Sequence, residues 1–238
     1  MASETDRIKE ITGKMDGWLA EGEGLLLYNL AKKCSKGVIV EIGSWKGKST
    51  IWLASGSKKG KNARVYAIDP HIGSPEHQKM FGKVWTFEEF KKNIKRAGVD
   101  DIIVPMVKKS EDAAKNFSKP VGLAFIDGDH EYDMVKLDYD LWFPKLVEGG
   151  VMAFHDTILR PGPAKIVEEK LCKSSRFKDI GFIGSITYGT KVRQNSFMDR
   201  LRGRYVIFLR RVYSFANHFH SLPAPVKRIG KKAIRAAQ

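Results

Sequence analysis

The fold class is decided by residues 38–49, Val38-Ile39-Val40-Glu41-Ile42-Gly43-Ser44-Trp45-Lys46-Gly47-Lys48-Ser49. The first three residues form a short apolar, β-branched run, which is typical of a buried strand. The two glycines that follow let the backbone turn sharply and approach a ligand closely. A helix predicted from Lys48 directs its free N–H groups and the positive end of its dipole at the same place. This order indicates a ligand-binding strand–turn–helix unit, although glycine also serves many tight turns for structural reasons alone.

Further strands alternate with helices along the chain. We expect strands at residues 64–69, 102–107, 121–126 and 151–154, and helices at 48–55, 86–97, 134–146 and 165–171, with a short helix after Ser110. Such alternation indicates a parallel, doubly wound sheet. Two more strands, 177–183 and 186–192, flank the hairpin signal Gly184-Ser185. We therefore predict an α/β fold with a Rossmann-like, mostly parallel seven-stranded sheet and an antiparallel C-terminal hairpin.

Two of these helices have capping signals at their starts. Thr86 and Glu89 match a capping box, in which each side chain satisfies a free backbone N–H. Ser110 is the expected N-cap of the next helix.

The positive charge of the chain is concentrated at its C-terminal end. The 238 residues include 42 Lys or Arg and 27 Asp or Glu, a net charge of +15. Residues 201–238 contain nine Lys or Arg and no acid, so +9 falls there and +6 on residues 1–200. A step of this kind marks a boundary between a domain and a basic appendage. We predict an N-terminal helical segment over 1–36, one domain over 37–198 and a basic amphipathic tail over 199–238.

The composition excludes several classes of protein. With 42% hydrophobic and 29% charged residues, the chain is neither disordered throughout nor collagen-like. No apolar run approaches the roughly 20 residues of a membrane span, and the polar start lacks a secretory signal. The two cysteines, Cys34 and Cys172, cannot build a disulfide scaffold. We expect a cytoplasmic protein.

The residues after each strand are the candidates for a ligand site, because ligands of such sheets bind outside the carboxyl ends of the strands. Asp69 follows the second strand, 26 residues beyond Gly43, and its carboxylate can accept hydrogen bonds from both ribose hydroxyls of a nucleoside. This spacing favours an adenosine-containing ligand without separating NAD(H) from S-adenosylmethionine. A helix cap or a solvated loop acid is the alternative. Ser110 and Glu111 follow the third strand, either as a cap or as contacts to a base.

Acids and histidines follow the fourth and fifth strands: Asp127-Gly128-Asp129-His130 and His155-Asp156. Buried carboxylates that converge are costly unless a positive group joins them. A divalent cation meets that need, and oxygen ligands favour Mg²⁺, Ca²⁺ or Mn²⁺. A neutral hydrogen-bond network, or a His–Asp pair that only orients loops, is the alternative. We expect His155 to contact the acids without itself binding the cation or the substrate.

Residues 37–192 resemble the class I S-adenosylmethionine-dependent methyltransferases, and above all the metal-dependent O-methyltransferases of the catechol type and their relatives that act on sugar hydroxyls. The resemblance implies that the cofactor is bound by Glu41, Gly43, Ser44, Trp45, Gly47, Ser49, Asp69, Ser110 and Glu111. It also implies that Asp127 and Asp156 bind a metal and that His130 is the catalytic base. In the family an Asn or Asp commonly follows the second acid as a third ligand. This chain has Thr157 there, so Asp129, His155 or water is left for that role.

The predicted function is methyl transfer from S-adenosylmethionine to a hydroxyl of a small molecule or a glycan, assisted by a cation such as Mg²⁺. A cation on Asp127 and Asp156 would orient the hydroxyl and lower its pKa, and His130 would take its proton. The long loop from His71 to Trp85, with His77 and Phe81, and the loop 157–164 are candidates for acceptor recognition.

Three competing functions make different demands on the sequence. An NAD-dependent oxidoreductase predicts a G-x-G-x-x-G loop, and none follows the first strand. A nucleic-acid methyltransferase fits the charge of +15, but residues 127–130 replace the usual N-P-P-Y-like motif, which disfavours a nucleic-acid partner. A non-catalytic relative predicts degraded strand ends, and these look intact.

The tail has the pattern of a basic amphipathic helix. Its apolar residues recur at helical spacing: Leu201, Tyr205, Phe208, Leu209, Val212, Phe215, Phe219 and Leu222. Arginines interleave with them, so residues 201–222 suit an anionic membrane surface. Pro223 and Pro225 are expected to end the helix. Docking of the apolar stripe on the domain itself or on a second subunit of a homo-oligomer, and contact with nucleic acid, are the alternatives.

Overall fold

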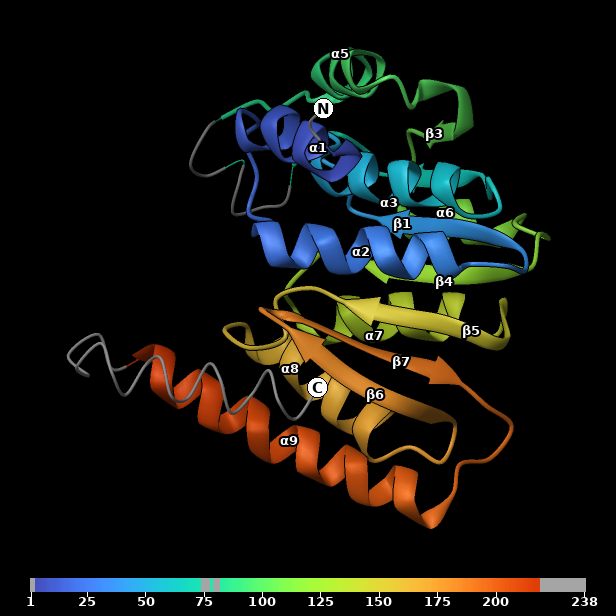
Figure 1. Cartoon of the computed structure of the whole chain (residues 1–238), viewed down its shortest axis with the longest axis vertical. Coiled ribbons are helices and arrows are strands. Elements are labelled where there is room, and N and C mark those ends of the chain that lie inside the picture. The colour runs from blue at the N-terminus through green and yellow to red at the C-terminus, as the bar shows by residue number, and fades with distance from the viewer. Residues whose placement is uncertain (1–2, 74–77, 79–81, 219–238) are drawn as a thin grey trace.

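The computed structural model describes residues 3–73, 78 and 82–218. Its strands form one sheet in the order β3-β2-β1-β4-β5-β7-β6 (Figure 1). The parallel strands are β1 (Val38–Ile42), β2 (Val65–Ile68), β3 (Ile103–Met106), β4 (Val121–Ile126) and β5 (Leu146–Phe154). An antiparallel hairpin of β6 (Phe177–Ile183) and β7 (Ile186–Lys191) closes the sheet beside β5. The predicted fold class is confirmed.

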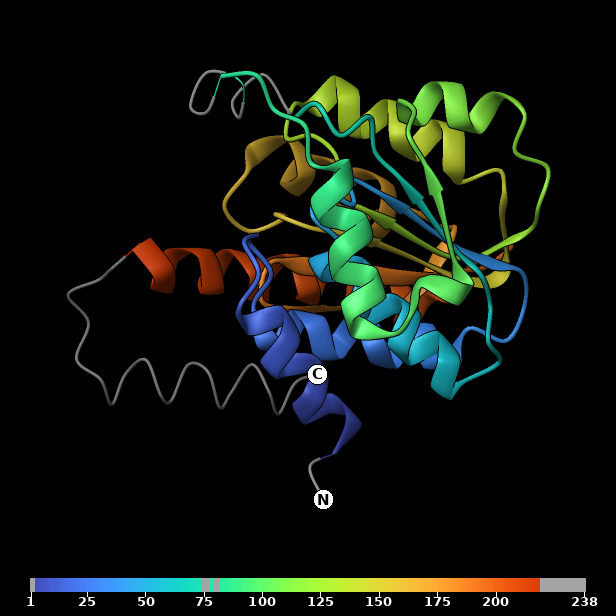
Figure 2. The same cartoon turned by 90° about the horizontal axis from the view of Figure 1, so that it is seen from above.

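Helices cover both faces of the sheet (Figure 2). The helices of one face are α1 (Glu4–Gly13), α2 (Glu21–Lys33), α3 (Lys48–Lys59) and α5 (Phe87–Ala97). Those of the other are α6 (Ser110–Lys115), α7 (Tyr132–Trp142), α8 (Pro161–Ile166), the π-helix η2 (Val167–Cys172) and α9 (Phe197–His218). A 3-10 turn, η1 (Asp100–Ile102), precedes β3. Because both faces are covered, every residue of β4 is buried.

Several element bounds differ from those predicted. The helix expected from Lys165 begins at Pro161, whose fixed φ suits the first turn, and it continues as η2. Leu146 begins β5 instead of ending α7, because it pairs with Val121 of the neighbouring strand. The division of the chain into three parts remains a prediction, but α9 contributes side chains to one hydrophobic core of the sheet and α2 to the other.

Both predicted helix caps are wrong, because tertiary partners occupy the side chains. Thr86 precedes α5, but its Oγ1 is hydrogen-bonded to Nδ1 of His71 at 2.9 Å and does not cap the helix. Glu89 forms an ion pair with Lys46 at 2.9 Å. Ser110 lies inside the first turn of α6, and its Oγ accepts a hydrogen bond from Nε1 of Trp142 at 2.9 Å.

The α9 helix docks on the domain through a face that the predicted stripe does not include. Gly203, Val206, Ile207 and Arg210 are buried against β6 and η2, whereas most of the predicted apolar stripe is exposed. Phe219, Leu222, Pro223 and Pro225 lie outside the described residues. Within the described part of the chain, no helix is long and apolar enough to cross a membrane.

The closest helix pair of the first face is α2 and α3, which meet through glycine. A Cβ added to Gly56 of α3 would lie 2.1 Å from the backbone oxygen of Tyr28 in α2. Backbone atoms cannot move aside as a flexible side chain does, so only glycine allows this approach. The contact matters for function because it fixes α2 beside the carboxyl ends of the strands.

We expect Gly56→Ala to lower the free energy of unfolding by about 1–3 kcal/mol, since steric overlap outweighs the gain in helix propensity. Gly13→Ala is the matched control, because nothing lies within 4 Å of a Cβ added there at the end of α1. Urea denaturation of both variants measures the difference. Equal stabilities would contradict the tight packing of α2 on α3.

Candidate functional site

The site forms where the strand order reverses, between β1 and β4. The backbone N–H of Asp127, directly after β4, donates to the oxygen of Ile42 at 2.8 Å. Gly43 has φ +88°, and a Cβ there would lie 2.2 Å from the oxygen of Asp127. Only glycine therefore brings the loop after β1 into contact with the end of β4.

Asp69 holds the two loops after β1 and β2 together. Its Oδ2 accepts a hydrogen bond from the backbone N–H of Trp45 at 2.7 Å, and its Oδ1 accepts one from that of His71 at 2.6 Å. The predicted ribose-binding acid is thus also the organiser of the loop backbone. Each carboxylate oxygen has a second lone pair with which it can accept a further hydrogen bond.

Three buried polar atoms near these strand ends lack a hydrogen-bond partner among the described residues: Glu41 Oε1, Ser44 Oγ and His71 Nε2. The other oxygen of Glu41 accepts a hydrogen bond from Thr50 at 2.5 Å, and burial raises the pKa of Glu41 to about 8. Buried polar atoms are rarely left without partners in folded proteins. These atoms therefore indicate a polar ligand at the ends of β1 and β2.

The remaining predicted cofactor residues have varied surroundings. Gly47 has φ +88° and lies at the N-cap of α3, and Ser49 is buried in the first turn of that helix. Glu111 is exposed. Sequence reasoning missed Asp138, a buried acid of α7 beside Ser110, where burial raises the pKa of Asp138 to about 6. Its signal was an acid at a helical position that faces inward.

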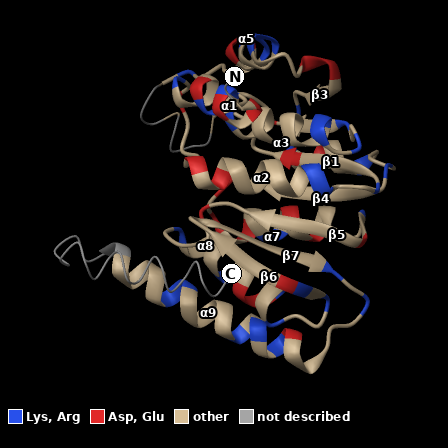
Figure 3. Cartoon of the chain, viewed as in Figure 1, with Lys and Arg blue, Asp and Glu red and all other residues tan. Residues whose placement is uncertain are grey.

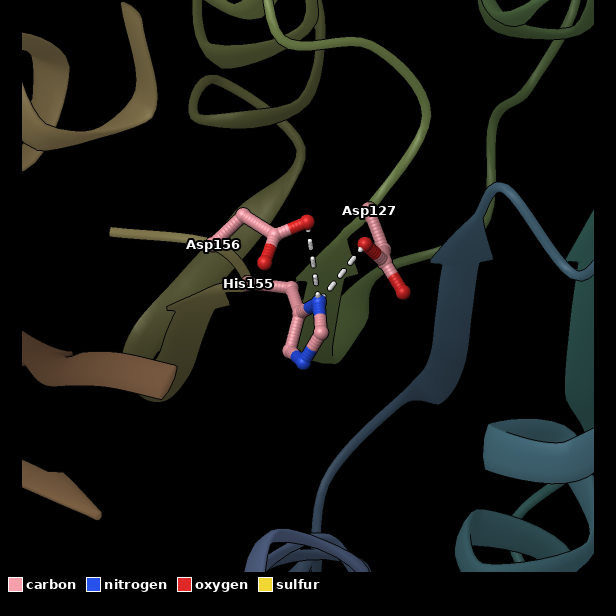
Figure 4. Close-up of side chains that lie close together, drawn as sticks. All are labelled: Asp127, His155 and Asp156. Carbon is pink, nitrogen blue, oxygen red and sulfur yellow. Dashed lines mark ion pairs between the residues drawn. The ribbon is translucent and has the colours of Figure 1, made fainter. Parts of the chain in front are cut away.

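The second half of the site is a cluster of acids and histidines after β4 and β5 (Figure 4). His155 Nδ1 lies 3.1 Å from Asp127 Oδ1 and 3.5 Å from Asp156 Oδ2. His130 Nε2 is hydrogen-bonded to the same Asp156 oxygen at 2.8 Å. The structure therefore brings the predicted residues together, with His155 more deeply buried than the two acids and in contact with both.

Glu23 of α2 completes this cluster, and sequence reasoning missed it. Its Oε2 lies 3.4 Å from His155 Nε2 and accepts a hydrogen bond from the N–H of Ala20 at 2.8 Å. Its Oε1 accepts hydrogen bonds from the backbone N–H and the hydroxyl of Ser185, at 2.6 and 2.8 Å. The available signal was an acid between Gly22 and Gly24 that directly precedes the apolar run Leu25–Leu27.

These contacts determine the charge of His155. Burial opposes its protonation, but Asp127, Asp156 and Glu23 outweigh burial and raise the pKa of His155 far above its ordinary value. Hydrogen bonds from His130 and His155 likewise overcome burial and lower the pKa of Asp156. Both ring nitrogens of His155 face carboxylate oxygens, an arrangement that favours a proton on each of them. A protonated His155 would supply the positive charge that the converging acids require when no metal is bound.

The cluster also contains a set of metal-ligand atoms. Asp127, His155 and Asp156 each offer one ligand atom, and these atoms lie within 4.8 Å of one another. Thr157, which stands where the family commonly has the third ligand, donates its hydroxyl to the oxygen of Ser185 at 2.7 Å. Asp129, the other side chain predicted for that role, accepts a hydrogen bond at Oδ1 from the backbone N–H of His130 at 2.6 Å.

The backbone is strained at three site residues. Trp45, His71 and Asp156 have φ values of +45°, +59° and +55°, which are uncommon for residues other than glycine. Such conformations persist only where the surrounding structure imposes them, and they concentrate at functional sites. Of the predicted acceptor loops, Trp85 is exposed beside His71, whereas His77 and Phe81 lie outside the described residues.

Comparisons with known proteins agree with this geometry. Residues 40–157 match a family model described as "Methyltransferase domain". A catechol O-methyltransferase of Mycobacterium tuberculosis is 30% identical over 141 residues, which cover 59% of this chain and 56% of that protein. The chain therefore spans little more than half the length of this relative.

Solved methyltransferase structures share the fold. The O-methyltransferase NovP has a TM-score of 0.63 at 18% identity, over 79% of this chain and 98% of that one. An O-methyltransferase from Bacillus cereus in complex with SAH has a TM-score of 0.59 at 18% identity, over 80% and 92% of the two chains. The predicted resemblance to the class I S-adenosylmethionine-dependent methyltransferases is therefore confirmed over residues 40–157.

We expect Glu23→Ala to destabilise the fold, because it leaves His155 and Ser185 without their buried acceptor, at a cost of about 1–3 kcal/mol for each group. Glu21→Ala is the control in the same helix. Glu21 forms an exposed ion pair with Lys9, and the loss of that pair costs less than about 1 kcal/mol. Urea denaturation distinguishes the two variants, and equal losses would show that Glu23 does not support the cluster.

Proposed function

We propose that this chain transfers a methyl group from S-adenosylmethionine to a hydroxyl of a small molecule or a sugar. The observation that carries the proposal is the contact between Gly43 and Asp127. This contact places the loop after β1, which has the features of a cofactor site, against the cluster of acids and histidines that can act on a hydroxyl. The methyltransferase match over residues 40–157 and the O-methyltransferase relatives support the same reaction.

The residues present fit S-adenosylmethionine. Glu41 Oε1, Ser44 Oγ and His71 Nε2 would contact its polar groups, since they are buried without partners among the described residues. A cationic amino group near Glu41 would stabilise the ionised carboxylate against the burial that raises its pKa. Asp69 would accept hydrogen bonds from the ribose hydroxyls through its remaining lone pairs. The bound cofactor supplies the activated methyl group.

His130 is proposed to take the proton of the acceptor hydroxyl. Its hydrogen bond to Asp156 orients the ring and raises the pKa of His130, which strengthens it as a base. In the tautomer that donates from Nε2 to Asp156, the lone pair lies on Nδ1. Proton transfer to His130 then produces an imidazolium that Asp156 stabilises.

A divalent cation is proposed to be held by Asp127, His155 and Asp156. Those atoms fit it, and Glu23 would accept the remaining N–H of His155, as carboxylates commonly do for metal-binding histidines. When bound, the cation would polarise the hydroxyl and lower its pKa. It would replace the proton on His155 Nδ1, so cation and imidazolium are alternatives at this position.

Asp69→Ala is expected to weaken binding of S-adenosylhomocysteine by roughly 10–150-fold. The variant loses the charge-assisted hydrogen bonds to the ribose hydroxyls, and the loops after β1 and β2 lose the carboxylate that holds them together. Asp112→Ala, which removes an exposed acid paired with Lys115, should leave binding unchanged. Titration calorimetry measures both, with NAD⁺ as a second ligand. Tight binding of NAD⁺ would overturn the assignment of the cofactor.

His130→Ala is expected to lower kcat by about 10²–10⁴-fold while the affinity for S-adenosylhomocysteine stays unchanged, because only the proton acceptor is removed. Glu131→Gln, at the exposed neighbouring position, is the control. Methyl transfer to catechol and to hydroxylated sugars is the readout.

The same assay with and without EDTA tests the cation. If the cation takes part, EDTA removes most of the activity and Mg²⁺ or Mn²⁺ restores it. Full activity in EDTA would leave His130 as the only group that activates the hydroxyl. Full activity of His130→Ala would remove His130 from the mechanism.

A further inference from the structure

A stripe of exposed apolar side chains runs along the outer side of α9. The stripe consists of Met198 (69% exposed), Leu201 (40%), Tyr205 (49%), Phe208 (61%), Val212 (42%) and Phe215 (63%). Their spacing alternates between three and four residues, so they form one continuous line along the helix. Isolated exposed apolar residues are ordinary, but an ordered line of them indicates an interaction surface.

The packing of α9 prevents the stripe from turning inward. A Cβ on Gly203 would lie 2.2 Å from the backbone oxygen of Cys172, so the backbones of α9 and η2 are in contact there and leave no room for a side chain. Val206 and Ile207 are buried in the core with β6, and the guanidinium of the buried Arg210 donates to the oxygen of Thr157. The exposure of the stripe therefore belongs to the folded protein.

The surroundings of the stripe are basic (Figure 3). Exposed Arg200, Arg202, Arg204 and Arg211 border it, and Asp199 is the only acid of α9. The sequence continues after α9 with five Lys or Arg and no acid through residue 238. Of the arginines that border the stripe, Arg211 already forms an ion pair with Glu168 at 3.3 Å. The partner must therefore accept an apolar helix face and neutralise the remaining positive charges at once.

A second copy of the chain and the chain's own C-terminal residues both meet the apolar requirement but not the charge. Two α9 stripes packed together would bring the flanking arginines of both copies close, and like charges at such positions oppose pairing. Residues 219–238 carry the same sign of charge as α9. An anionic lipid surface meets both requirements, and aromatic side chains are favoured at its boundary with water.

We propose that α9 docks on an anionic membrane surface, with its apolar stripe in the boundary between headgroups and acyl chains and its arginines at the lipid phosphates. The helix would lie along the surface. Arg210 and Ser214 of its C-terminal half contact the backbone oxygens of Thr157 and Ile158, which directly follow Asp156. This end of α9 lies on the side to which β1 and β5 point (Figure 1). Docking therefore brings the candidate catalytic cluster near the lipid.

The test is sedimentation of the full chain with phosphatidylcholine vesicles, prepared with and without phosphatidylserine. We expect binding only to the anionic vesicles and its loss at high salt. Leu201→Ser/Phe208→Ser should weaken binding at least roughly tenfold, since the buried apolar area is lost. Leu25→Ser/Met134→Ser, which changes exposed apolar residues elsewhere, is the control and should bind normally.

A second pair of variants tests the charge. Arg200→Gln/Arg204→Gln should weaken binding by roughly 30-fold, about fivefold for each arginine. Lys92→Gln/Lys95→Gln removes the same charge from α5, at the opposite end of the molecule, and should change binding little (Figure 1). Unchanged urea midpoints would confirm that all four proteins are folded.

Three outcomes would overturn the proposal. One is equal binding of the full chain to neutral and anionic vesicles. Another is normal vesicle binding by Leu201→Ser/Phe208→Ser. The third is a dimer in sedimentation equilibrium that this variant abolishes, without any vesicle binding, because the stripe would then be an interface between two copies.

Discussion

The structure depends on the contact of one buried ring, His155, with the carboxylates of Glu23, Asp127 and Asp156. A charge at a residue only 4% exposed is costly unless it is paired. The acids would equally repel one another without a positive group, a proton or a cation, at that ring. Each group is therefore tolerable only because the others are present.

This cluster joins parts of the chain that are far apart in sequence. Glu23 reaches it from α2 and also binds the hairpin turn through Ser185, while Asp127 and His155 come from the ends of β4 and β5. The packing of α2 on α3 through Gly56 fixes the position of α2, and with it the position of Glu23 beside the strand ends. The N-terminal helices therefore shape the site as well as covering the sheet.

The other half of the site relies on backbone geometry more than on side-chain charge. Asp69 accepts hydrogen bonds from two loop N–H groups, and Trp45 and His71 adopt positive φ values in those loops. The close approach of Gly43 to Asp127 then places this loop against the charged cluster. A ligand bound by the first half is thus held beside the reactive groups of the second.

The sequence by itself determined the succession of strands and helices along the chain and the C-terminal hairpin, because apolar periodicity and glycine turns are local signals. It also indicated the family, because the Gly43–Gly47 loop with Asp69 is a local signal too. It also identified Asp127, His130 and Asp156 as neighbours, because residues after parallel strands meet at one edge of a sheet. Only the tertiary structure decided the position of His155 and the part played by Glu23, since the two lie 132 residues apart and meet through helix packing. Likewise, Thr86 and Ser110 match cap patterns, but partners distant in sequence take their hydroxyls. In α9 the helical period showed that the helix is amphipathic, but Gly203 and Arg210 determined which face is buried, because close backbone contact and a buried guanidinium depend on the surface beneath the helix.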